Sequence, residues 1–260
     1  MGAKPEVLAP AGDRERLDMA LAYGADAVYL AGTAFGMRAF AGNFDRDGLK
    51  EAVSAAHAKG VRVHVTCNTL ARNHEVAQLP GYLEYLDAIG VDAVIAAGPE
   101  VLDLCRRRAP HVQVHMSTQT GITNYETARV WHELGASRVI LARELSLEVA
   151  ELKAKAPRGL EVECFVHGAM CVSWSGRCLL SNYMTGRDAS RGACAQPCRY
   201  QYALMEEKRP GEYFPVFEEN GETFIMNSRD MCMIDHIPAL MAAGVDSLKI
   251  EGRAKSAYYA

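Results

Sequence analysis

One pattern of apolar and polar positions recurs along the chain: an amphipathic helix-like stretch, a glycine, and then a short run that is almost entirely apolar. The glycines are Gly24, Gly60, Gly90, Gly135 and Gly244. Each fits the end of a helix, where glycine adopts the left-handed backbone conformation at little cost. Because the apolar runs have no polar face, they predict parallel strands that are buried on both sides.

The pattern predicts eight strands, at residues 7–10, 27–30, 61–66, 93–96, 113–116, 138–141, 160–166 and 247–250. Helical patterns separate the first seven, among them residues 14–23, 48–59, 79–89, 124–134 and 147–155. Alternating strands and helices predict a parallel α/β fold. Eight strands favour a (β/α)8, TIM-like barrel over a doubly wound open sheet, and no G-x-G-x-x-G loop follows any of the strands.

About 80 residues separate the seventh and eighth predicted strands, far more than an ordinary connection needs. This stretch holds most of the cysteines, a hairpin-like pair around residues 213–217 and 222–226, and a helix near 234–243. We therefore expect a single barrel domain over residues 1–260, with a Cys-rich insertion at 168–233 on the C-terminal face, where such barrels place their active sites. The sequence stops soon after the eighth strand, so the barrel is expected to be truncated at its last helix.

Composition narrows the class of protein. Of the 260 residues, 49% are hydrophobic and 23% are charged, which is globular and excludes a disordered chain. The net charge of −4 excludes a protein that coats nucleic acid and leaves room only for a local basic patch. No apolar run is long enough for a membrane helix, and the N-terminus lacks the features of a signal peptide. We therefore expect a cytoplasmic protein without membrane association.

Eight cysteines in such a protein favour metal binding or catalysis over a disulfide framework. Cys67 and Cys105 stand alone in apolar surroundings and are expected to pack in the core, as is Cys164 within a strand. The other five are spaced C-x6-C-x15-C-x3-C, followed by a cysteine 34 positions later: Cys171, Cys178, Cys194, Cys198 and Cys232.

Four thiolates are the usual ligands of an iron–sulfur cluster, so these five cysteines predict a 4Fe–4S cluster with one residue to spare, Cys194 or Cys198. Zinc is the nearest competitor, because four thiolates suit it too. Structural zinc sites commonly use closely paired cysteines, however, and only Cys194 and Cys198 come near that spacing.

Polar residues gather where the predicted strands end, and these ends converge on one pocket in a barrel. We expect Arg143 and Arg253 to clamp a carboxylate or phosphate there, and His167 or Glu251 to transfer protons. The alternative is that Arg143–Glu144 and Lys249–Glu251 are ion pairs on the barrel rim. The expected substrate-binding set is Asn68, Gln119, Arg143, Lys249 and Arg253.

Four arginines fall within 23 residues of the insertion, with Trp174, Tyr183, Tyr200 and Tyr202 in or beside that span. Arginines and aromatic rings together suit phosphate contacts and base stacking, so we expect RNA binding. The alternative is a solvated loop whose arginines pair with acids such as Asp188. The four arginines are Arg177, Arg187, Arg191 and Arg199.

Hydrolysis of peptides has little support from the residues themselves. His167 and Cys171 are four positions apart and could be imagined as a thiol-protease dyad, but nothing marks a third residue that orients the histidine. Neither the H-E-x-x-H motif of metalloproteases nor the G-x-S-x-G motif of serine hydrolases occurs.

Residues 163–181 read E-x-F-x2-G-A-M-C-x4-G-R-C-x-L-S, which resembles the signature of the collagenase-like peptidase family U32. The resemblance extends over the whole chain. It includes LAPAG (8–12), GADAVYL (24–30), CNT (67–69), STQ (117–119), LARELS (141–146), RGACAQPCR (191–199), NSRDMC (227–232) and KIEGRAKSAYY (249–259).

The resemblance implies two kinds of activity. Some members of the family carry a peptidase label. Others are iron–sulfur proteins of hydroxylations that need no molecular oxygen, which act on the tRNA wobble uridine, on ribosomal RNA or in ubiquinone synthesis. NSRDMC and KIEGR look most like the tRNA branch, which makes 5-hydroxyuridine and depends on prephenate. By this resemblance the cluster ligands are Cys171, Cys178, Cys194 and Cys232.

Two features depart from the family pattern. Relatives often have an aspartate after the fourth strand, where this chain reads Ala97-Gly98-Pro99. Relatives also continue past the KIEGR segment, which agrees with a truncated barrel. The leading hypothesis is a tRNA hydroxylase that uses a small acidic co-substrate; a collagenase-like peptidase and a non-catalytic iron–sulfur accessory protein are the alternatives.

Overall fold

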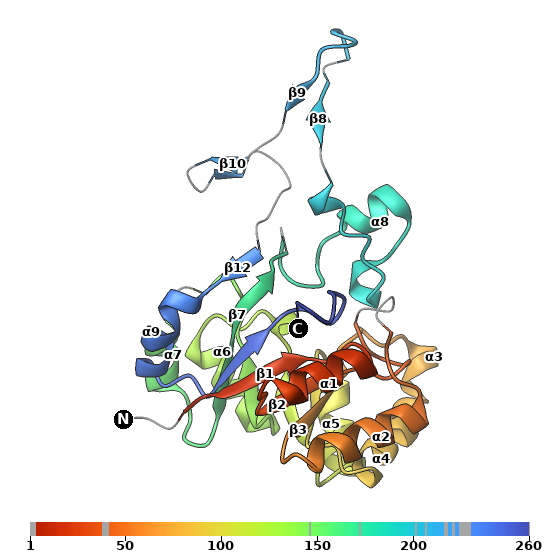
Figure 1. Cartoon of the computed structure of the whole chain (residues 1–260), viewed down its shortest axis with the longest axis vertical. Coiled ribbons are helices and arrows are strands. Elements are labelled where there is room, and N and C mark those ends of the chain that lie inside the picture. The colour runs from red at the N-terminus through yellow and green to blue at the C-terminus, as the bar shows by residue number, and fades with distance from the viewer. Residues whose placement is uncertain are drawn as a thin grey trace.

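The computed structural model describes residues 4–37, 42–145, 147–171, 173–200, 202–205, 207–215, 218–219, 222–223 and 230–259. Eight parallel strands close into a barrel, in which β13 pairs with both β7 and β1 (Figure 1). This confirms the predicted TIM-like fold. The barrel strands are β1 (Glu6–Pro10), β2 (Ala27–Leu30), β3 (Arg62–Cys67), β4 (Ala93–Ala96), β5 (Gln113–Met116), β6 (Arg138–Ile140), β7 (Glu161–Ala169) and β13 (Ser247–Ile250).

Helices follow the first six strands and cover the outside of the barrel, as the periodicity predicts. The five glycines proposed as helix ends all have positive φ, between 71° and 117°. Side-chain caps begin several helices; Asp13, Asp45 and Asn124 each accept a backbone N–H of the first turn. The helices are α1 (Arg14–Ala22), α2 (Arg46–His57), α3 (Asn73–Val76), α4 (Leu79–Ala88), α5 (Pro99–Arg108), α6 (Tyr125–Leu134) and α7 (Val149–Lys155), and a 3-10 turn, η1 (Thr118–Thr120), follows β5.

The insertion between β7 and β13 lies over the C-terminal ends of the barrel strands, where the sequence places it (Figure 1). Strand β12 returns to the barrel and pairs antiparallel with the end of β7. The remaining elements are α8 (Leu180–Thr185), η2 (Ala189–Arg191), η3 (Pro197–Arg199), β8 (Ala203–Leu204), β9 (Phe214–Pro215), β10 (Glu218–Glu219), β11 (Glu222–Thr223), β12 (Asp230–Cys232), η4 (Ile234–His236) and α9 (Ile237–Ala242).

The predicted hairpin is wrong in its pairing. Strand β9 pairs with β8, and β10 pairs with β11. The sequence between Glu219 and Glu222 is Asn-Gly, the commonest two-residue hairpin loop, and it favours the shorter pairing. Residues 216–217 and 224–226 of the predicted pair lie outside the described residues. The predicted helix near 234–243 begins as the 3-10 turn η4 and continues as α9.

Two layers of apolar side chains build the core. The larger cluster lies between the strands and the helices, whereas a small cluster inside the barrel consists of Leu8, Ala27, Tyr29, Ile95 and Ile140, with Phe165 packed against it. Cys67 and Cys105 are fully buried and Cys164 packs against the outer cluster, as expected. Burial raises the pKa of the thiols of Cys105 and Cys164 to about 12, so both behave as apolar groups.

Beside the small apolar cluster, the barrel interior also contains charged side chains. The carboxylate of Glu163, 0% exposed, accepts a hydrogen bond from Arg138 at 2.8 Å on one side and one from Lys249 at 2.8 Å on the other. Arg138 also binds Glu6 at 2.6 Å and Glu161 at 2.6 Å. Burial opposes the charged carboxylate, but Lys249 and Arg138 outweigh it and lower the pKa of Glu163 to about 2.

Two histidines share this interior, on β3 and β5. His64 and His115 are 1% and 0% exposed, and their rings meet edge to face with centroids 4.7 Å apart. Burial lowers the pKa of His64 to about 4, and burial together with His64 lowers that of His115 well below its ordinary value. Both imidazoles are therefore neutral in the folded protein at neutral pH.

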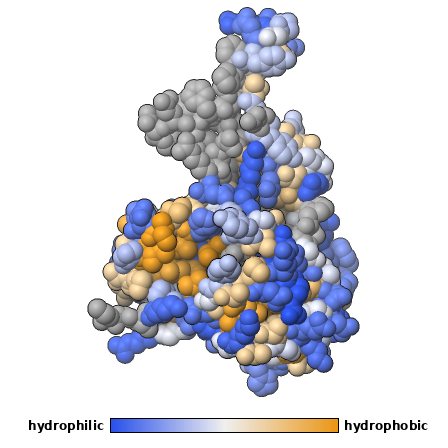
Figure 2. Space-filling view, viewed as in Figure 1, coloured by the Kyte–Doolittle hydropathy of each residue, from blue (hydrophilic) through white to orange (hydrophobic). Residues whose placement is uncertain are grey.

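An apolar cavity of about 320 Å³ opens beside α9 and is lined largely by residues such as Leu145, Leu147, Met231 and Leu240. Figure 2 shows apolar side chains gathered on this side of the barrel, next to α9. Within the described ranges, no helix combines the length and apolar character that crossing a bilayer would require.

Replacing Glu163 with glutamine should destabilise the protein by about 3–5 kcal/mol, because it leaves two buried cations without their shared carboxylate. Chemical denaturation followed by circular dichroism measures this. The exposed pair Glu151–Lys155 offers a matched control, and Glu151→Gln should cost about 0.5 kcal/mol or less. Equal losses in the two variants would contradict the role given to Glu163.

Stability should fall as the pH drops from 6.5 to 4. The unfolded chain binds protons on His64 and His115 over this range while the folded chain does not, so protons favour unfolding. At about 1.4 kcal/mol per pKa unit, His64 alone accounts for roughly 3 kcal/mol of the stability lost over this pH range. Melting temperatures measured across this range should fall less steeply with decreasing pH for His64→Asn than for wild type. A flat wild-type profile would refute this.

Candidate functional site

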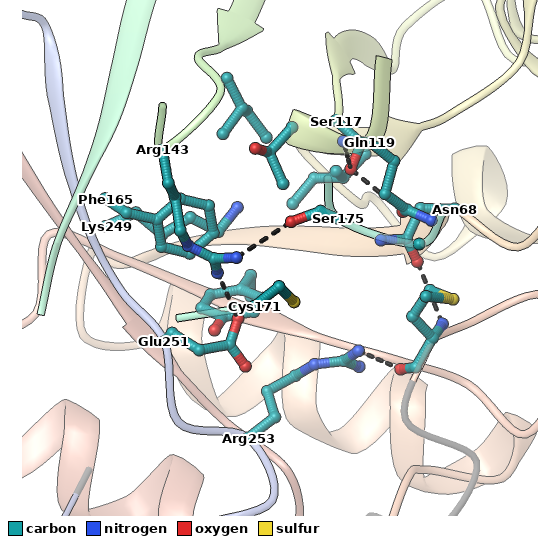
Figure 3. Close-up of a pocket in the computed structure, with 16 residues that line it drawn as sticks. Asn68, Ser117, Gln119, Arg143, Phe165, Cys171, Ser175, Lys249, Glu251 and Arg253 are labelled. Atoms are coloured by element: carbon teal, nitrogen blue, oxygen red, sulfur yellow. Dashed lines mark hydrogen bonds and ion pairs between the residues drawn. The ribbon is translucent and has the colours of Figure 1, made fainter. Parts of the chain in front are cut away.

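The C-terminal ends of the barrel strands enclose a cavity of about 70 Å³ beneath the insertion (Figure 3). Side chains reach it from most of the barrel strands or the loops that follow them, and from the first turn of the insertion. The lining residues include Tyr29, Met37, Asn68, Ser117, Thr118, Gln119, Arg143, Phe165, Cys171, Ser175, Gly176, Lys249, Glu251 and Arg253. We call this cavity the mouth pocket.

Arg143 crosses the mouth pocket from the loop after β6. Its guanidinium lies 4.0 Å from the ring centroid of Phe165, donates to the hydroxyl of Ser175 at 3.0 Å, and pairs with the carboxylate of Glu251 at 3.3 Å (Figure 3). The stacking and the two polar contacts hold the planar guanidinium in one orientation. A planar, oriented guanidinium is suited to binding a carboxylate through two hydrogen bonds.

Lys249 forms the floor of the mouth pocket. It points inward from β13, as its place in an apolar strand suggests, and its ammonium lies 4.5 Å from the ring centroid of Tyr29 and 5.4 Å from that of Phe165. Burial lowers the pKa of Lys249, although its ion pair with Glu163 opposes this. The ion pair with Glu163 favours the charged ammonium, which lies at the floor of the pocket.

Arg253 and Asn68 both bind the backbone of Met37, in the loop after β2. Arg253 donates to the carbonyl of Met37, and the side-chain oxygen of Asn68 accepts the N–H of Met37 at 3.0 Å. The two residues thus fix one wall of the mouth pocket (Figure 3). Beside Asn68, the hydroxyl of Ser117 donates to the amide oxygen of Gln119 at 3.2 Å (Figure 3).

Backbone geometry at the end of β7 places Glu251. Gly168 has φ +115°, and a Cβ there would lie 2.4 Å from the carbonyl oxygen of Glu251, so only glycine permits this approach. The N–H of Glu251 donates to the carbonyl of His167 at 2.8 Å. The ring of His167 packs against that of Tyr259, with centroids 5.5 Å apart, and is not among the lining residues of the mouth pocket.

The structure brings together all five residues that the sequence assigns to substrate binding, and Glu251 with them. The suggested rim pairs are replaced by others: Arg143 pairs with Glu251, and Lys249 with Glu163. Sequence reasoning missed Ser175 and Glu163. The sequence does contain a signal for Glu163, because it alternates with Phe165 on the inward face of β7. No such signal exists for Ser175, because its position depends on how the insertion folds.

The insertion arginines differ in their roles. Arg191 pairs with Glu75 and donates to the carbonyl of Leu70 at 2.7 Å, which ties the insertion to the loop after β3. Arg187 donates to the carbonyl of Ala193 at 2.9 Å, and Arg199 donates to the amide of Gln196 at 3.2 Å. These three stabilise the insertion, while Arg177 is exposed at its edge.

The cysteines proposed as cluster ligands are free thiols on the insertion and beside it. Cys171 lines the mouth pocket; the sulfurs of Cys178 and Cys194 each accept a backbone N–H, from Leu180 and Gln196. Thiolates are the right donors for iron, yet in the part of the chain that the structure describes no three His, Cys, Asp or Glu side chains gather closely enough to hold a metal ion. The four cysteines, as they are placed in this structure, therefore do not form a complete set of metal ligands.

The chemistry of the mouth pocket is that of an anion site. Its lining contains three cations, Arg143, Lys249 and Arg253, and one carboxylate, Glu251. Aromatic rings of Tyr29 and Phe165 line the floor, so the pocket suits a small acid with an apolar body.

Two curated relatives match almost the whole chain. It is 44% identical to tRNA hydroxylation protein P1 of Bacillus subtilis and 36% identical to tRNA hydroxylation protein P of Escherichia coli, over 98% of this chain in both cases. The match covers 60% and 65% of those relatives, so the chain spans less than two thirds of their length.

The solved structure of the U32 peptidase Mk0906 has the same fold. It superposes with a TM-score of 0.62 and 16% sequence identity, over 96% of this chain and 93% of that one. The sequence model of peptidase family U32 matches residues 12–260. Signature, fold and relatives agree, and the chain belongs to peptidase family U32.

Proposed function

We propose that this chain acts in the oxygen-independent hydroxylation of the tRNA wobble uridine to 5-hydroxyuridine, with prephenate as an acidic co-substrate. The observation that carries the proposal is the mouth pocket, in which three cations face one carboxylate directly beneath the insertion. The relatives named as tRNA hydroxylation proteins support the same reaction class.

Arg143 is the residue proposed to bind the acid. Its guanidinium is oriented by Phe165 and Ser175, so little side-chain entropy is lost when a carboxylate binds. Lys249 beneath it adds a fixed positive charge in a water-poor site, where electrostatic attraction is stronger than in bulk solvent. Prephenate carries two carboxylates, which match the cations, and a hydroxylated cyclohexadiene ring that can lie against the aromatic floor.

Glu251 takes two roles in the proposal. Its carboxylate pairs with Arg143, so an acidic co-substrate must compete with it for the guanidinium. Once displaced, Glu251 is held by the backbone of His167 at the edge of the mouth pocket and is positioned to accept or donate a proton there. His167 faces Tyr259, and this contact is better suited to holding the segment after β13 than to proton transfer.

An iron–sulfur cluster on Cys171, Cys178, Cys194 and Cys232 is part of the proposal and would supply redox or Lewis-acid chemistry when bound. The donor types suit it, but the described residues do not gather these thiols. The roles given above to Arg143, Lys249 and Glu251 do not depend on it.

The function is tested in a strain that lacks the gene. Mass spectrometry of its tRNA nucleosides should show loss of 5-hydroxyuridine, restored by the wild-type gene. A gene that carries Arg143→Met should restore about a tenth or less of the wild-type amount of 5-hydroxyuridine. A hydrogen bond to a charged group contributes about 1.5–3 kcal/mol to binding, and this variant loses it.

Lys155→Met, which removes an exposed cation far from the mouth pocket, is the matched control and should restore modification fully. Calorimetry with prephenate separates acid binding from folding: purified Arg143→Met that is shown to be folded by circular dichroism should bind prephenate weakly. Normal 5-hydroxyuridine in the deletion strain would overturn the proposal and leave a peptidase or an accessory protein.

Protein purified without oxygen should be brown and contain about four irons per chain, as one cubane cluster requires. Cys178→Ser should lose most of this iron, whereas Cys105→Ser, at a buried thiol in the outer core, should keep it. A colourless wild-type protein with one zinc per chain would contradict the cluster.

A further inference from the structure

A second cavity adjoins the mouth pocket on the side of the insertion. It has a volume of about 330 Å³ and is lined by Thr118, Gln119, Gly121, Trp174, Ser175 and Arg177. We call it the side cavity. It shares Thr118, Gln119 and Ser175 with the mouth pocket, so whatever occupies one lies against whatever occupies the other.

One tight turn of the insertion serves both cavities. The N–H of Arg177 donates to the carbonyl of Trp174 at 3.0 Å, and Gly176 has φ +73° within this turn. A Cβ on Gly176 would lie 2.8 Å from the amide nitrogen of Gln119, so the turn packs directly on that amide. The turn therefore directs Ser175 toward Arg143 and places Trp174 and Arg177 around the side cavity.

Trp174 presents an open ring surface there. A Cβ on Gly121 would lie 3.6 Å and 3.7 Å from two of its ring carbons, so the backbone of Gly121 supports part of the indole. The residue is nonetheless 45% exposed. A large aromatic side chain that is supported by a glycine and open to a cavity is a platform for stacking a planar group.

Gln119 adds a polar group where the side cavity meets the mouth pocket. It is 9% exposed, and its amide oxygen accepts from Ser117, which leaves the amide nitrogen toward Gly176 and the side cavity. That nitrogen can donate to a ring carbonyl of a pyrimidine. Arg177, exposed at the rim, is placed to contact a phosphate.

We propose that the side cavity is the subsite for the target pyrimidine, which leaves the RNA stack, lies on Trp174 and receives a hydrogen bond from Gln119. This inference rests on the proposed function and adds where the base binds. Enzymes that modify a base commonly extrude it into a pocket of this kind. The shared wall then sets the base beside the acid held by Arg143.

Fluorescence can test this directly, because the chain has only two tryptophans, Trp131 and Trp174. In a Trp131→Phe protein, Trp174 is the sole indole. An anticodon stem-loop RNA with a wobble uridine should quench its emission, and the same RNA with an abasic wobble position should bind more weakly and quench little. Equal quenching by both RNAs, or no binding of either, would overturn the inference.

Affinity of the same stem-loop gives the second readout. Trp174→Ala should bind it about ten- to a hundredfold more weakly, and Trp174→Phe should recover most of that loss, because a smaller ring still stacks. Tyr23→Ala, at an exposed ring at the end of α1 and outside the insertion, is the matched control and should bind within twofold of wild type. For the abasic RNA, Trp174→Ala and wild type should not differ.

The outcomes separate this inference from the function on which it rests. Suppose that Trp174→Ala binds the uridine stem-loop like wild type and that the wild-type gene restores 5-hydroxyuridine to the deletion strain. The base subsite is then wrong and the proposed function stands. If the deletion strain retains 5-hydroxyuridine, the proposed function falls, whatever the stem-loop measurements show.

Discussion

The buried carboxylate of Glu163 is the constraint on which the site depends. Two buried cations, Arg138 and Lys249, share this carboxylate at 2.8 Å each, and Glu6 and Glu161 complete the partners of Arg138. Isolated buried charges cost several kcal/mol each, so none of the three could be replaced alone without penalty. The arrangement fixes Lys249 as the floor of the mouth pocket, and with it the positive charge that the other pocket residues share.

Above this floor, the insertion completes the pocket. Strand ends supply Arg143, Asn68 and Arg253, but Ser175 comes from the first turn of the insertion and orients Arg143. Arg191 anchors the rest of the insertion to the loop after β3 through Glu75. The insertion is thus not a separate module placed on a finished site, since the walls of the mouth pocket require both parts.

Much of this could be predicted from sequence, for physical reasons. The glycine-punctuated apolar runs determine the barrel, and β2, β4, β5 and β13 have the predicted bounds because strands buried on both faces leave little ambiguity. Strand ends converge in any such barrel, so Arg143, Lys249 and Glu251 could be grouped in advance. Their pairing could not, because it depends on the approach at Gly168 and on the inward face of β7. The hairpin prediction failed because such short strands carry no periodicity that would show which of them pair.

The charged interior also links distant parts of the chain. Glu6, Arg138, Glu161, Glu163 and Lys249 come from the first, sixth, seventh and last barrel strands and are joined in one chain of ion pairs. Many (β/α)8 barrels can be regarded as half-barrel or quarter-barrel units that can be exchanged between proteins. In this barrel, replacing β1 or β13 with the corresponding strand of another barrel would remove one member of a set of buried ion pairs. Chimeric or circularly permuted proteins should therefore fold only when their crossover points keep all of these charged residues together.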